Sequence, residues 1–242
     1  MRILGHRGAS ADFPENTLEA FQGAAAQGAD GVELDVMRCR SGELVVCHDE
    51  VLERLAGVRW EVTRTDWARL RTADVGTRLG FKPARIPLLG EVFDALPRHL
   101  FVNVELKCDA LDDRGLSEAV GKLLVERELE ERVFVSSFNP LNLVRLARAY
   151  PRLRRGLLID PEKAWLPQAW GWLLVAARTS VHPHFSACTP ARVSRWHDHG
   201  LEVAAWTVDD VDEARALRAM RVDWLITNRP GALRKELARL RV

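Results

Sequence analysis

The sequence predicts an α/β protein with a (β/α)8 TIM-barrel fold and a small insertion after the second strand. Short apolar runs rich in β-branched residues alternate with amphipathic helical patterns along nearly the whole chain. A length of 242 residues, with 47% hydrophobic and 29% charged residues, suits one soluble barrel domain. An open doubly wound sheet is the alternative, but no GxGxxG dinucleotide fingerprint follows the first strand.

The strands are expected where short apolar runs are bounded by turn residues. They are residues 2–7, 31–38, 101–107, 132–138, 155–160, 180–184, 202–208 and 223–227. Each is followed, directly or after a longer loop, by an amphipathic pattern that predicts a helix. These helices are expected at residues 17–27, 88–97, 115–128, 140–149, 163–177, 190–199, 210–220 and 231–240. Together they form a single domain over residues 1–242.

Residues 39–87 interrupt this alternation and form a connection much longer than an ordinary barrel loop. The stretch carries one more strand signal, GELVVCHD, and then a segment rich in turn residues. We interpret it as an insertion in the loop after the second strand. Long loops in compact domains are more often functional than idle, so we expect this insertion to take part in the function of the protein.

The charge balance excludes proteins that bind nucleic acid through a large positive field, because 35 basic and 34 acidic residues leave a net charge of +1. We therefore expect a small-molecule partner bound by local charges. The four cysteines have no CxxC spacing and are expected to be reduced thiols. Neither a signal peptide nor a long apolar span is evident, which predicts a cytoplasmic protein without stable membrane insertion.

Acidic residues recur on the second and third predicted strands, in the segments GVELDVM and VNVELKC. Side chains alternate along a strand, so Glu33 and Asp35 share one face, as do Glu105 and Lys107. A salt-bridged lumen would explain one such strand, but acids on two adjacent strands at the same end favour a hard divalent cation. Mg²⁺ or Ca²⁺ is expected, with Mn²⁺ as a further alternative, and zinc is disfavoured because no histidine pair shares a ligand spacing with them.

Two histidines close strands near this expected cation site. His6 ends the first strand and His48 ends the extra strand in the insertion. Imidazoles titrate near neutral pH, so such a pair can divide acid and base work. Arg7 and Lys107 add fixed positive charge beside them. The combination predicts a site where a phosphoryl group undergoes displacement.

The motifs HRG, PENT, ELDV, HD and VELK occur in this order and resemble the glycerophosphodiester phosphodiesterase family, cytoplasmic bacterial type. The likeness continues through SSF, HPH, AWTV and TNRP and so covers nearly the whole chain. The resemblance implies a metal-dependent barrel hydrolase that converts glycerophosphodiesters to sn-glycerol 3-phosphate and an alcohol, in glycerol and lipid metabolism. By motif, it assigns the cation to Glu33, Asp35 and Glu105, acid–base catalysis to His6 and His48, and phosphate binding to Arg7 and Lys107.

The family mechanism implies that one histidine deprotonates the glycerol 2-hydroxyl, which attacks phosphorus, while the other protonates the departing alcohol. Water then opens the cyclic phosphate with the roles reversed. The sequence leaves open which histidine is the base, although His6 is favoured. Two rivals remain: a lysophospholipid-cleaving relative, which should show an apolar rim where residues 39–87 carry many Arg and Asp, and a non-catalytic phosphate-binding barrel.

Several further residues have alternative interpretations. Phe138 and Trp206 end strands and either contact the substrate or pack in the core. His182 and His184 flank a proline and more often pack than bind zinc. Asn16 is expected to cap the first helix, and the role of Glu15 is open. The leaving alcohol, the native cation, the oligomeric state and any role for His182 and His184 cannot be read from the sequence.

Overall fold

The computed structural model describes residues 1–163 and 179–239. Its main feature is a closed sheet in which each strand of the barrel pairs in parallel with its two neighbours, and the last barrel strand pairs with the first. The predicted (β/α)8 barrel is confirmed. The barrel strands are β1 (Arg2–His6), β2 (Gly31–Arg38), β4 (Phe101–Leu106), β5 (Val133–Ser137), β6 (Arg154–Ile159), β7 (Thr179–Pro183), β8 (Glu202–Ala205) and β9 (Trp224–Thr227).

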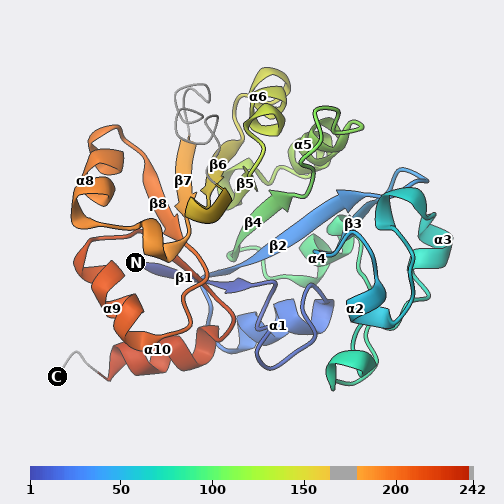
Figure 1. Cartoon of the computed structure of the whole chain (residues 1–242), viewed down its shortest axis with the longest axis horizontal. Coiled ribbons are helices and arrows are strands. Elements are labelled where there is room, and N and C mark those ends of the chain that lie inside the picture. Colours follow the sequence, from blue (N-terminus) through green and yellow to red (C-terminus); the bar gives the residue numbers. More distant parts are fainter. Residues whose placement is uncertain (164–178, 240–242) are drawn as a thin grey trace.

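Helices cover the outside of this barrel (Figure 1). They are α1 (Leu18–Ala26), α4 (Leu89–Ala95), α5 (Leu116–Glu126), α6 (Pro140–Ala149), α8 (Pro190–Asp198), α9 (Val211–Ala219) and α10 (Pro230–Ala238). The helix predicted at residues 163–177 lies outside the described residues. Among the helices that the structure describes, none is long and apolar enough to cross a membrane.

The two faces of β2 show why this chain forms a barrel. Val32, Leu34 and Val36 are fully buried on the outer face, in an apolar cluster that contains residues of α1 and α4. Glu33 and Asp35 alternate with them and therefore face the lumen, as the period of two predicts. The strand is therefore buried along its whole length except at Arg38, and its two acids are the polar residues within that buried run.

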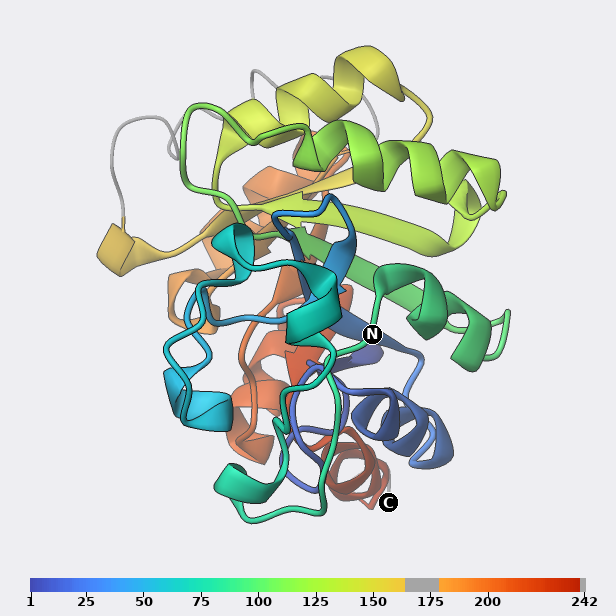
Figure 2. The same ribbon diagram turned by 90° about the vertical axis from the view of Figure 1, so that its right-hand side faces the viewer.

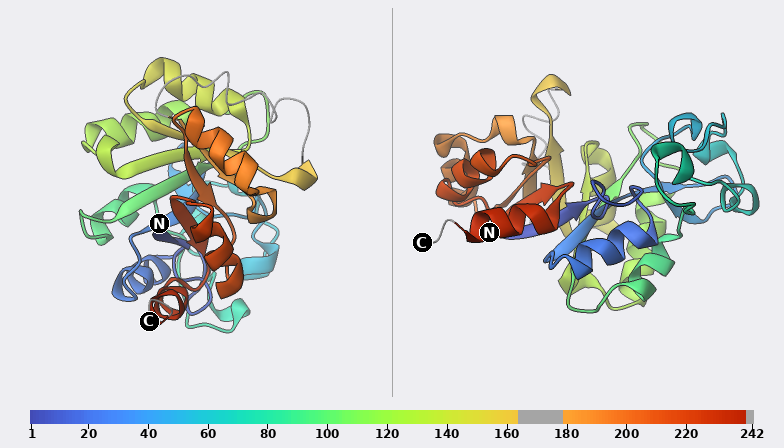
Figure 3. Two further views of the ribbon diagram at one scale, coloured as in Figure 1. Left: turned by 90° about the vertical axis from the view of Figure 1, so that its left-hand side faces the viewer. Right: turned by 90° about the horizontal axis from the view of Figure 1, so that it is seen from below.

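The last described helix packs against the first strand. In Figure 3, helix α10 lies beside β1, and the two elements are in contact. Strand β8 ends three residues earlier than predicted, at Ala205, and Trp206 makes only an isolated bridge to His184. Trp206 also lines the pocket described below.

The segment after β2 has a small core of its own. Strand β3 (Leu44–Val46), the one predicted within GELVVCHD, pairs antiparallel with the end of β2 and is followed by α2 (Glu53–Ala56) and α3 (Trp67–Leu70). Their buried apolar residues form a separate cluster with Met37 and Ile86. Figures 1 and 2 show the segment in cyan and teal at the carboxyl end of β2. That it is an insertion within one domain stays a prediction.

Candidate active site

A pocket of about 170 Å³ opens among the carboxyl ends of the barrel strands. Every residue that the sequence singles out for cation binding, acid–base work, phosphate binding or substrate contact lines it, except Asp35, which lies behind Arg7 and Lys107. The lining residues from that set are His6, Arg7, Glu33, His48, Glu105, Lys107, Phe138 and Trp206. The structure therefore brings the whole predicted set together, and the roles of these residues stay predictions.

Three carboxylates converge at one side of the pocket. Strand β2 pairs with β4 so that Asp35 lies opposite Glu105. Glu33, two residues earlier in β2, lies on the same face as Asp35. One oxygen from each carboxylate lies within 4.8 Å of the other two, and all three side chains are buried. Oxygen donors of this kind and spacing fit a hard divalent cation.

The electrostatics of this cluster also fit a cation. Burial raises the pKa of Glu33 well above its usual value, and the neighbouring charges of Asp35 and Glu105 raise it further. Burial and the charge of Asp35 likewise raise the pKa of Glu105 to about 7. Buried carboxylates that repel one another are stabilised in the charged form by a positive ion between them. The residues present therefore suit a divalent metal, whose identity they do not select.

Asp35 differs from its two neighbours because it has its own polar partners. Burial alone would raise its pKa, but the guanidinium of Arg7 and the ammonium of Lys107 hold the pKa below its usual value. The Arg7 Nε atom lies 3.2 Å from Asp35 Oδ2. Asp35 is therefore the acid in this cluster that stays ionised most readily.

Asn16 also supports Asp35, and the prediction that it caps α1 is wrong. Its Nδ2 donates to Asp35 Oδ2 at 2.8 Å, and its Oδ1 accepts from the Asp35 backbone N–H at 3.2 Å. Thr17 caps the helix instead, since its hydroxyl accepts from the Ala20 N–H. Asn16 has a φ of 58°, a left-handed conformation that asparagine tolerates and that turns its side chain into the barrel.

Glu15 bridges two arginines at the edge of the site. Its Oε1 accepts from Arg7 at 2.9 Å and from Arg54 at 2.7 Å. Together with His48 and Asp49 it forms a second cluster of ligand-type atoms. Because guanidinium groups already occupy both carboxylates, this second cluster is less suited to a cation than the buried trio. Glu15 instead fixes the position of Arg7.

His6 is positioned by Asn228, a residue that was not predicted from the sequence as part of the site. Its Nδ1 lies 2.7 Å from Asn228 Oδ1, and the Asn228 Nδ2 donates to Asp209 Oδ2 at 2.6 Å. Burial and the nearby charge of Arg7 lower the pKa of His6 to about 4. Asn228 belongs to the TNRP motif noted above, and this motif could have identified it as a site residue. No sequence motif pointed to Asp209.

His48 has a carboxylate partner instead. Its Nδ1 lies 2.9 Å from Asp49 Oδ1, and Arg54 also pairs with that carboxylate. Burial lowers the pKa of His48, while the charge of Asp35 opposes the shift. The His48 side chain is 33% exposed and the His6 side chain 19% exposed. His48 therefore lies nearer the mouth of the pocket and His6 nearer its floor.

Lys107 also contacts acids of the trio. Its ammonium lies 3.0 Å from Glu105 Oε1 and 3.8 Å from Asp35 Oδ1. These contacts, which outweigh burial, raise the pKa of Lys107. In this arrangement Lys107 neutralises buried acids, and it lines the pocket at the same time. The geometry is compatible with both the phosphate-binding role and the purely structural one.

Phe138 and Trp206 form one aromatic wall, with ring centroids 5.6 Å apart in an edge-to-face arrangement. The indole Nε1 of Trp206 donates to the His182 carbonyl at 2.6 Å. His182 itself is fully buried, with its Nε2 2.8 Å from Ser180 Oγ. His184 packs against Phe185 and pairs with Ser186. Both histidines thus occupy packing positions, the interpretation that the sequence favoured over zinc.

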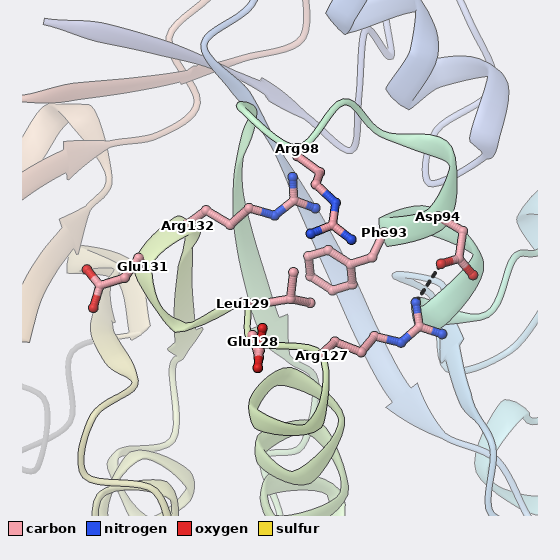
Figure 4. A pocket seen from close by; sticks show the side chains of 8 residues that line it. All are labelled: Phe93, Asp94, Arg98, Arg127, Glu128, Leu129, Glu131 and Arg132. Atoms are coloured by element: carbon pink, nitrogen blue, oxygen red, sulfur yellow. Dashed lines mark hydrogen bonds and ion pairs between the residues drawn. The ribbon is translucent and has the colours of Figure 1, made fainter.

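A larger cavity of about 510 Å³ lies at the opposite, amino-terminal end of β4 and β5 (Figure 4). Its charged groups are three arginines and three acids, and Arg127 pairs with Asp94 at 2.7 Å. No histidine or cysteine lines it, and among the described residues its three acids do not form a group whose ligand atoms lie close enough together to hold a metal ion. Size alone therefore does not mark the reactive site, and the smaller pocket holds the chemical groups.

The chain resembles known proteins along almost its whole length. The profile of the "Glycerophosphoryl diester phosphodiesterase family" matches residues 6–232. A glycerophosphodiester phosphodiesterase from Caldanaerobacter subterraneus is 35% identical, over 96% of this chain and 95% of that protein.

Solved structures give the same picture. An Oleispira antarctica phosphodiesterase, solved in complex with the product sn-glycerol-3-phosphate, has a TM-score of 0.83 and 28% identity, covering 98% of this chain and 97% of that one. A glycerophosphodiester phosphodiesterase from Thermotoga maritima has a TM-score of 0.80 and 29% identity, covering 97% of each chain.

Proposed function

Because this chain belongs to the glycerophosphoryl diester phosphodiesterase family and is therefore a phosphoric diester hydrolase, we propose that it cleaves glycerophosphodiesters to sn-glycerol 3-phosphate and an alcohol. The observation that carries the proposal is the convergence of three buried carboxylates and two imidazoles on one small pocket. The product bound by the Oleispira antarctica relative supports the same assignment.

In this proposal, Glu33, Asp35 and Glu105 bind the cation. When bound, a divalent metal there polarises phosphoryl oxygens and makes a nearby hydroxyl more acidic. Mg²⁺, Ca²⁺ and Mn²⁺ all accept such oxygen ligands. Arg7 lies beside the same carboxylates and orients a phosphate oxygen through its guanidinium. Lys107, which lies beside Glu105, binds a second phosphate oxygen.

His6 is proposed as the base. The carboxylate of Asp209 accepts from Asn228 Nδ2, which leaves Asn228 Oδ1 facing the imidazole as an acceptor. His6 must then carry its proton on Nδ1 and present a free lone pair on Nε2. With a pKa of about 4, His6 is neutral at physiological pH and ready to take the proton of the glycerol 2-hydroxyl.

His48 is proposed as the acid. The carboxylate of Asp49 accepts from its Nδ1 and stabilises the imidazolium form. Its greater exposure places it toward the mouth, where the alcohol departs. Attack by the 2-hydroxyl and protonation of the leaving alcohol by His48 would give a cyclic phosphate. Water then opens that ring, with His48 as base and His6 as acid.

The test is an activity panel on purified protein. Glycerophosphodiesters with different alcohols are compared with lysophospholipids, in the presence of Mg²⁺, Ca²⁺ or Mn²⁺ and with excess chelator. We expect release of sn-glycerol 3-phosphate that stops on chelation and is absent from Glu33→Gln. Full activity in chelator would refute the metal dependence, and cleavage of lysophospholipids alone would favour the lipid-cleaving relative. The cytoplasmic location and the lack of a nucleic-acid partner stay predictions.

A further inference from the structure

A neutral side-chain amide whose oxygen has no hydrogen-bond partner among the described residues lies in the wall of the pocket, on the same strand as Glu105. Asn103 is 1% exposed, and its Oδ1 is buried without a hydrogen-bond partner. Asn103 nevertheless lines the pocket. Buried amides are nearly always paired in native proteins, so an unpaired one in a binding pocket points to a ligand.

The position of Asn103 along β4 places it at the floor. Side chains at alternate positions share a face, so Asn103, Glu105 and Lys107 follow one another toward the carboxyl end. Asn103 and Glu105 are 1% and 8% exposed, and the Lys107 side chain is 21% exposed. Exposure therefore increases from the floor to the mouth. Leu158 and Ile226 line the pocket with Asn103.

The substrate has three parts, which the pocket can hold in only one order. The phosphate diester is charged and belongs beside Arg7 and Lys107. The leaving alcohol varies in size and must point to the mouth, because a pocket of about 170 Å³ cannot enclose a large group. The glycerol end farthest from phosphorus therefore reaches the floor. It is uncharged, has a short carbon chain and ends in a hydroxyl.

From this order, and on the premise of the proposed function, we propose that Asn103 binds the terminal hydroxyl of the glycerol. This hydroxyl is not the nucleophile, so its contact selects the substrate without taking part in bond making. An amide offers both donors and an acceptor to an alcohol, and the apolar Leu158 and Ile226 suit the carbon chain. A site built to hydrogen-bond a substrate hydroxyl discriminates strongly against the analogue that lacks it.

The experiment compares two diesters with the same leaving alcohol. One carries glycerol, and the other carries propane-1,2-diol, which keeps the 2-hydroxyl and lacks the terminal one. Wild-type protein is expected to prefer the glyceryl diester by roughly 10²-fold or more in kcat/KM. Asn103→Leu should lose most of that preference, through a fall in kcat/KM for the glyceryl diester alone. Ser136→Ala is the matched control, since Ser136 is also buried and unpaired on the next strand but does not line the pocket.

Several outcomes would overturn the assignment. Equal losses for both diesters in Asn103→Leu, together with weaker cation-dependent thermal stabilisation, would make Asn103 a cation ligand instead. A wild-type protein that cleaves both diesters equally would refute hydroxyl recognition, whether or not the variant folds. A wild-type protein that cleaves neither would refute the proposed function and this inference with it. Retention of the substrate preference by Asn103→Leu would refute the inference alone.

Discussion

The Nδ1 atom of His6 lies 2.7 Å from Oδ1 of Asn228, although the two residues are at opposite ends of the chain. They are neighbours because β9 pairs with β1 and so closes the barrel. The Asn228 amide is fixed in turn by Asp209, which accepts from its Nδ2 at 2.6 Å. A contact that selects one tautomer of His6 therefore depends on closure of the fold.

Asn228→Ala should lower turnover by roughly 10- to 100-fold, because His6 would no longer be held in the tautomer that frees Nε2. KM should change little, since Asn228 does not line the pocket. Ser10→Ala is the control, because the Ser10 hydroxyl lies within hydrogen-bond distance of the same Oδ1 and of the His6 carbonyl, and neither contact involves the imidazole. Steady-state kinetics on both variants check this. A rise in KM at unchanged kcat would contradict a positioning role.

His6 and His48 should respond differently to the leaving group. A nitrophenol leaves without help from an acid, so His48→Ala should lose about 10²- to 10⁴-fold with an alkyl alcohol and far less with glyceryl nitrophenyl phosphate. His6→Ala should lose similar factors with both substrates, because the attacking hydroxyl is the same. The measurement is kcat for each variant with each diester. If the nitrophenyl diester rescued His6→Ala instead, the two roles would be exchanged.

Lys107→Met separates the two interpretations of Lys107. A phosphate contact whose importance grows in the transition state predicts that turnover falls more than KM rises. A structural role, based on its 3.0 Å contact with Glu105, predicts weaker folding or weaker cation binding and normal turnover at saturating cation. Kinetics and thermal unfolding are measured on the same samples, with the exposed Lys122→Met as control. Wild-type turnover at saturation would remove Lys107 from the catalytic set.

The barrel and most of the site follow from local patterns. Alternation within GVELDVM is enough to place Glu33 and Asp35 in the lumen, and the parallel order of strands then brings Glu105 beside them. The support of His6 by Asn228 could not be derived this way, because it depends on the register of β9 against β1. Asn16 was misassigned for a related reason. Asparagine favours both a helix cap and a left-handed turn, so the local sequence does not distinguish them. The folded structure does, because the Asn16 side chain bonds to the buried Asp35.

His182 should make the free energy of unfolding depend on pH. Burial and the charge of Arg154 lower its pKa from 6.5 to about 3. Between these values the unfolded chain binds a proton that the folded protein does not. The contribution is therefore fully present above pH 6.5 and is lost as the pH falls toward 3, with a slope of up to roughly 1.4 kcal/mol per pH unit.

His182→Gln removes this titration, so its free energy of unfolding should fall less steeply than that of the wild type between pH 6.5 and 4. Above pH 6.5 the two curves should run parallel, which provides an internal control, although the variant is less stable throughout because the ring packs against Gly156 and Phe134. Denaturant unfolding at a series of pH values gives both curves. The half-buried His6 titrates in the same pH window in both proteins, so its contribution cancels in the difference. Curves that stay parallel down to pH 4 would show that His182 is protonated in the folded protein.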